Sequence, residues 1–135
     1  MRDRVDTWWT SRETARWYRE MYSGENALGW RLTRDRLREM HRRTRAQGAE
    51  LLVVRWPLLV GLDGRYPFAD VDGLIAAFLD AEGIARHDLL PALRGRGTEP
   101  LWVHPVDRHP NEAAHRLAAE SLLPVVRRLG EAARP

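Results

Sequence analysis

The residues that most restrict the fold are Leu51-Leu52-Val53-Val54, an apolar run only four positions long. Strand side chains alternate between two faces, so a run that is apolar at every position needs cover on both faces. This pattern is typical of a central parallel strand between helices, and Pro57 ends it. We therefore expect residues 51–54 to form a buried strand of an α/β sheet.

Two helical segments precede this run. Thr10 and Glu13 have the spacing of a capping box, which predicts a helix from about residue 11 to 22. A second helix is expected over residues 29–47, with Gly48 as its C-cap. Aromatic and sulfur-containing side chains gather around the first helix and predict a core or docking face: Trp8, Trp9, Trp17, Tyr18, Met21 and Tyr22.

The chain after the strand alternates between helix and strand. Apolar residues at helical spacing predict a helix from Asp70, its expected N-cap, to Gly83. Residues 84–88 are a weaker strand candidate, and a last helix is expected from near Asn111, with Pro124 as a kink or early end. This order predicts one small α/β layered domain over residues 1–135, with helices in 1–48 and the α/β part in 49–130.

Composition excludes several classes of protein. The 135 residues are 44% hydrophobic, which fits a single domain with a core, and the absence of cysteine excludes disulfides and thiolate metal sites. The apolar runs are too short for a membrane span or a secretory signal. All 22 basic residues are arginine, but they alternate with 19 acidic residues, which favours a solvated surface over a nucleic-acid interface.

The densest group of polar side chains lies between residues 104 and 115. Three of the five histidines and one aspartate occur there, in an expected loop that leads into the last helix. In an α/β sheet such loops follow the carboxyl ends of the strands, where ligands bind. A zinc or iron site is one reading of the group, although no familiar ligand spacing is present. Its members would be His104, Asp107, His109 and His115.

The run from Asp107-Arg108-His109-Pro110-Asn111 to Glu120 resembles the last catalytic block of the SGNH hydrolases, the GDSL-type esterases and lipases. The similarity extends over about residues 49–126. It implies an incomplete three-layer α/β/α flavodoxin-like fold. It also implies that His109 is the general base of a Ser-His-Asp triad, oriented by Asp107, and that His115 belongs to the scaffold. The substrate would be a small ester or acylated molecule, with no cofactor and no metal.

The chain departs from that family in two ways. The usual spacing is Asp-x-x-His, whereas a single residue separates Asp107 from His109. The Gly-Asp-Ser block that carries the nucleophile is absent, as are the blocks that supply oxyanion donors. The three serines, Ser11, Ser23 and Ser121, lack the required context. We therefore expect a C-terminal segment of such an enzyme, inactive alone, that associates with a second copy or with an N-terminal half.

The need for these residue types follows from chemistry. A serine hydroxyl is a poor nucleophile near neutral pH, so a neutral imidazole must take its proton while a carboxylate fixes the imidazole tautomer. Asp107 and His109 can supply two of the three members. Two other functions remain open: a non-catalytic interaction module that docks through its Trp-rich N-terminal helix, and an arginine-rich nucleic-acid binder. Near the expected strands, Arg55 is interpreted as a solvated or sheet-end residue rather than one that faces the site, and Asp88 as a cap of the following turn.

Overall fold

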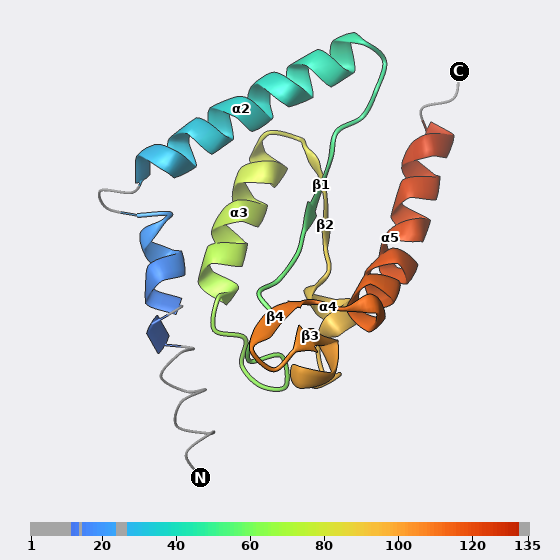
Figure 1. The fold of residues 1–135 in the computed structure, drawn as a ribbon. Helices are drawn as coiled ribbons and strands as arrows, with labels where there is room; N and C mark the ends of the chain where they lie inside the picture. The colour runs from blue at the N-terminus through green and yellow to red at the C-terminus, as the bar shows by residue number, and fades with distance from the viewer. Residues whose placement is uncertain (1–11, 14, 24–26, 133–135) are drawn as a thin grey trace.

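The structure is a computed structural model that describes residues 12–13, 15–23 and 27–132. Within these residues the chain is mixed α/β (Figure 1). Residues 12–13 and 15–20 are helical, whereas Thr10, Trp8 and Trp9 lie outside the described part. The following elements, in chain order, are α2 (Ala27–Ala46), β1 (Leu52–Arg55), α3 (Ala69–Ala81), β2 (Ala85–Asp88), α4 (Leu90–Leu93), the 3-10 turn η2 (Glu99–Leu101), β3 (Trp102–His104), β4 (Asp107–Pro110) and α5 (Glu112–Ala132).

Strands β1 and β2 form a two-stranded parallel sheet with α3 as the connection between them. The register pairs Val53 with Arg86 and Val54 with His87, so the two pairs project to opposite faces. On one face, Val53 packs with Phe78 of α3 in a small apolar cluster. On the other face, His87 is bonded to α5. Figure 1 shows α3 and α5 on opposite sides of the strands. The expected parallel pairing is therefore confirmed.

The expectation that residues 51–54 form a buried central strand is wrong. A sheet of two strands has no central strand, and the outer edge of β1 has no partner strand among the described residues. Val54 is 38% exposed, and its neighbours Leu52 and Val53 are only half-buried. Leu74 of α3 is also 40% exposed. A four-residue apolar pattern predicts that a strand forms. It does not predict how many strands pair with it.

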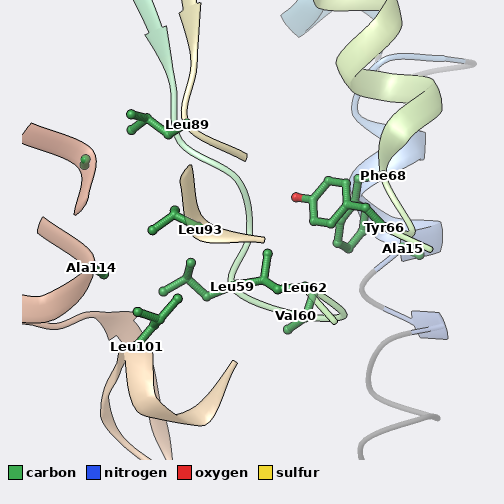
Figure 2. Close-up of a cluster of buried hydrophobic side chains, with 11 residues drawn as sticks. Ala15, Leu59, Val60, Leu62, Tyr66, Phe68, Leu89, Leu93, Leu101 and Ala114 are labelled. Carbon is green, nitrogen blue, oxygen red and sulfur yellow. The ribbon is translucent and has the colours of Figure 1, made fainter. Parts of the chain in front are cut away.

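The main core lies beyond the carboxyl ends of the strands rather than around them. Phe68, Leu62 and Leu93 are completely buried there. Figure 2 shows that the loop after β1, α4, η2 and the start of α5 all contribute side chains to this region. The loops after the strands are therefore anchored by apolar packing, which holds in place the elements that carry the polar residues.

The expected helices are present, with differences at their ends. Helix α3 begins at Ala69 with Phe68 as its N-cap residue, so Asp70 is not the cap. Instead, Asp70 Oδ2 accepts a hydrogen bond from Arg19 Nε at 2.5 Å. Helix α5 continues through Pro124 to Ala132, so this proline does not end the helix.

Residues 104–110 are not a loop. They form part of an antiparallel hairpin in which β3 and β4 are joined at residues 105–106. Two prolines and two charged residues in this region disfavour a strand by local propensity, and the pairing with β3 organises it. None of the helices in the described part of the chain is long and apolar enough to span a membrane.

Candidate functional site

Asp107 and His109 lie close together on β4. A single residue separates them, so in an extended strand both side chains project to the same face. Nδ1 of His109 is 2.5 Å from Oδ1 of Asp107, and the same oxygen accepts the backbone N–H of His109 at 3.1 Å. The predicted hydrogen bond between carboxylate and imidazole is confirmed. The short Asp-x-His spacing is explained by the extended backbone.

This arrangement determines which imidazole nitrogen can accept a proton. Asp107 is an acceptor when ionised, and its pKa is held below the usual value because the His109 side chain and backbone both donate to it. The proton of neutral His109 therefore belongs on Nδ1, which leaves the lone pair on Nε2 free. The His109 side chain is 86% exposed, so solvent or a bound molecule can reach it.

Asn111, directly after β4, connects η2 and β3 to the last helix. Its Oδ1 accepts hydrogen bonds from the backbone N–H groups of Ala113 and Ala114, which makes it the N-cap of α5. Its Nδ2 donates to the carbonyl oxygens of Pro100 and Trp102, both at 2.9 Å. The expected helix start near Asn111 is thus confirmed, and the same side chain connects η2, β3 and α5.

An open hollow of about 670 Å³ lies beside the Asp107–His109 pair. One wall is residues 56–59, the segment after β1, and the other is residues 106–110. Nε1 of Trp102 donates to the carbonyl oxygen of Leu59 at 2.8 Å, which ties the indole ring to a residue of the first wall. The guanidinium of Arg108 lies 5.1 Å from the Trp102 ring centre. The hollow therefore combines an apolar wall with a proton acceptor at its edge.

The other histidines near the pair have separate partners. His104 Nδ1 accepts the backbone N–H of Val106 at 3.3 Å, and the His115 ring packs 5.0 Å from the Trp56 ring. Among the residues that the structure describes, no three histidine or carboxylate side chains come together in a group that could hold a metal ion. The suggested ligand set of His104, Asp107, His109 and His115 is therefore not assembled.

No serine that the structure describes is hydrogen-bonded to His109. Ser23 Oγ donates to the Arg19 carbonyl oxygen, and Ser121 Oγ lies 2.8 Å from Nε2 of His87. Ser11 lies outside the described residues. Sequence reasoning missed the Ser121–His87 pair, which joins positions 34 residues apart. The sequence feature that could have indicated this pair is Ser121, a polar residue on the otherwise apolar face of the last helix.

A buried ionic cluster at the carboxyl ends of β1 and β2 was also missed. Arg55 is not a solvated residue, because its side chain is only 13% exposed and bridges Asp72 and Asp88. Asp88 also caps the following turn, as expected, by accepting the Leu90 N–H at 2.8 Å. Nη1 of Arg55 is 2.8 Å from Asp72 Oδ1, but neither Asp72 oxygen has a well-formed hydrogen bond. Burial raises the pKa of Asp72 to about 6.

Comparison with known proteins gives no relative. No protein family, curated protein or solved structure matches this chain.

Proposed function

We propose that this chain carries the acid–base part of a serine ester hydrolase of the SGNH type, with His109 as general base and Asp107 as the residue that orients it. The supporting observation is the 2.5 Å hydrogen bond between His109 Nδ1 and Asp107 Oδ1, which leaves Nε2 directed away from the carboxylate. The proposal also rests on the resemblance of residues 107–120 to the last catalytic block of that family.

The proposed fold is the C-terminal part of a three-layer α/β/α domain. Helices α3 and α5 on opposite sides of a parallel sheet support this assignment. The hydrogen-bonded pair and the hollow beside it lie after the strands, on the side where α/β enzymes place their ligands. The hollow of about 670 Å³ is large enough for a small ester, and Trp56 to Leu59 would contact its acyl chain.

In the proposed mechanism, Nε2 of His109 takes the proton of a serine hydroxyl as the oxygen attacks the ester carbonyl. The imidazolium is stabilised by Asp107, and His109 then returns the proton to the leaving alcohol. The serine is not supplied by any described residue near His109. Because the sequence lacks a Gly-Asp-Ser block, the proposal assigns the nucleophile and the oxyanion donors to a second polypeptide segment.

Complementation tests this function. The chain would be co-expressed with a fragment that carries the Gly-Asp-Ser, glycine and Gly-x-Asn-Asp blocks of an SGNH hydrolase. We expect turnover of p-nitrophenyl butyrate only in the mixture, with a loss of about 10³-fold or more on His109→Gln. His115→Gln is the matched control and should retain the activity. Turnover that is unchanged by His109→Gln would refute the proposed role.

A second candidate function is a protein-interaction module. Trp17 is 58% exposed and Leu28 is 56% exposed, and both line a hollow of about 690 Å³ between the first helical segment and α2. Exposed apolar side chains gathered in one place mark interaction surfaces. This candidate predicts that the apparent mass in sedimentation equilibrium rises with concentration, and that Leu28→Glu abolishes the rise. Leu123→Glu, on the exposed side of α5, is the matched control.

A further inference from the structure

Three arginines line one hollow beside the first turn of α3. The hollow has a volume of about 590 Å³, and its arginines are Arg12, Arg19 and Arg65. They come from two separate segments, the N-terminal helical segment and the turn after β1. Among the described residues that line the hollow, Asp70 is the one carboxylate. Arginines thus outnumber carboxylates among the described lining residues, and Arg12 also has an interaction partner of its own.

The floor of this hollow is apolar and rigid. Tyr66 and Ala15 are 3% and 5% exposed, and both belong to the main core (Figure 2). Gly61 adopts a φ of +63°, and a Cβ there would lie 3.1 Å from Pro67 Cδ, so glycine allows the close approach of these two lining residues. The arginines around the hollow are thus next to packed core residues.

One arginine is already fixed in position. Arg19 donates from Nε to Asp70 and from Nη2 to the Pro67 carbonyl oxygen, at 2.5 and 2.6 Å. The guanidinium therefore loses little freedom when it binds an anion. Arg65 is exposed and forms no ion pair with a described residue. Its charge is available to a ligand.

The position of Asp70 shows what kind of group this place accepts. Its carboxylate sits beside the guanidinium of Arg19 at the first turn of α3. Phe68, the N-cap residue of α3, provides no side-chain cap, and the Asp70 carboxylate accepts backbone N–H groups of this first turn. Asp70 thus occupies part of the site in the way that an external anion would.

We propose that this hollow binds a small molecule that carries a phosphate group on an apolar body. Guanidinium groups match the geometry of phosphate oxygens, and the fixed Arg19 and the unpaired Arg65 would contact them from two sides. The apolar body would lie on Tyr66 and Ala15. This site does not involve the Asp107–His109 pair and is independent of the function proposed for it.

Phenyl phosphate and inorganic phosphate are suitable probes, followed by amide chemical shifts in NMR titrations of the full chain. We expect saturable shifts centred on Gly61, Arg65 and Ala69, with phenyl phosphate bound several-fold more tightly than phosphate. Arg65→Glu should weaken binding at least tenfold. Asp70→Asn should strengthen it, because the substitution removes the competing carboxylate.

The control is Arg36→Glu, which makes the same charge change on the exposed face of α2. It should leave the affinity within about twofold, and His109→Gln should have no effect. Equal weakening by Arg36→Glu and Arg65→Glu would show that phosphate responds only to net charge and would overturn the proposal. Shifts that do not saturate, or that are centred elsewhere, would overturn it as well.

Discussion

Nε2 of His87 on β2 lies 2.8 Å from Oγ of Ser121 on α5, and this bond attaches the last helix to one face of the sheet. Both side chains are half-buried, so neither can exchange its partner freely for water. Ser121, the described serine that is bonded to a histidine, is therefore used in packing. It is not presented to the Asp107–His109 pair.

Ser121→Ala should lower the free energy of unfolding by about 1 kcal/mol, because half-buried His87 loses its hydrogen-bond partner. Urea denaturation at pH 7.5 measures this change. Ser23→Ala is the matched control, since Ser23 is exposed and bonds only to a helix carbonyl. Equal stability of wild type and Ser121→Ala would contradict the tethering role.

Asp72 should make the protein less stable as pH rises from about 4 to about 6. Its pKa is raised from 3.8 to about 6 in the folded chain, mainly by burial, so the folded state binds the proton more tightly than the unfolded state does. The contribution of protonated Asp72 to the free energy of unfolding is fully present below pH 4 and is lost as the pH rises through 6. Arg55 opposes this shift, whereas Asp88 and Asp70 reinforce it.

Asp72→Asn tests this sign. The variant should gain stability relative to wild type between pH 4 and 7, by roughly 1–3 kcal/mol at pH 7. Denaturation curves at half-unit pH intervals measure the difference. Asp80→Asn is the opposite control, because Arg86 lowers the pKa of Asp80 and the variant should be slightly less stable at pH 7. A flat difference between Asp72→Asn and wild type would exclude the raised pKa.

Asn111→Ala should cost about 1–2 kcal/mol of stability, because α5 loses its N-cap. It also removes the donors to Pro100 and Trp102, so amide shifts along β3 should move. Asn111→Asp keeps the capping oxygen but loses those donors. Its free energy of unfolding should lie between the values for wild type and Asn111→Ala. If Asn111→Asp were as unstable as Asn111→Ala, the cap would contribute nothing.

The isolated chain should show no serine-esterase activity above a histidine-bearing control protein. Neither Ser23 nor Ser121 is hydrogen-bonded to His109. The sequence also lacks the blocks that supply oxyanion donors in the SGNH hydrolases. The assays are turnover of p-nitrophenyl acetate and covalent labelling by a fluorophosphonate. Labelling of a serine in this chain that disappears on His109→Ala would show that a complete triad exists here.

Local sequence patterns predicted most of the elements. The helical spacing of Val71, Phe78 and Leu79 located α3, and all three are buried. The turn chemistry of Asn111 located the start of α5. These features succeed because they depend on residues close in sequence, whose spacing fixes which face they share.

The features that sequence reasoning missed depend on pairing across the fold. β1 is partly exposed because, among the described residues, only β2 pairs with it. The residues of β1 do not determine how many strands join the sheet. Arg55 meets Asp72 and Asp88 only once β1, α3 and β2 are assembled. Within the candidate site, the family resemblance predicted that Asp107 orients His109, but the extended backbone that brings the two side chains together comes from pairing with β3.

The tautomer of neutral His109, measured by long-range ¹H–¹⁵N NMR, tests the central claim most directly. The 2.5 Å contact with Asp107 predicts that the proton resides on Nδ1 in the wild type and that Nε2 has the chemical shift of an unprotonated nitrogen. Asp107→Ala should return the proton mainly to Nε2, whereas His115 should be the same in both proteins. A wild-type His109 protonated mainly on Nε2, and unchanged by Asp107→Ala, would contradict the proposed base.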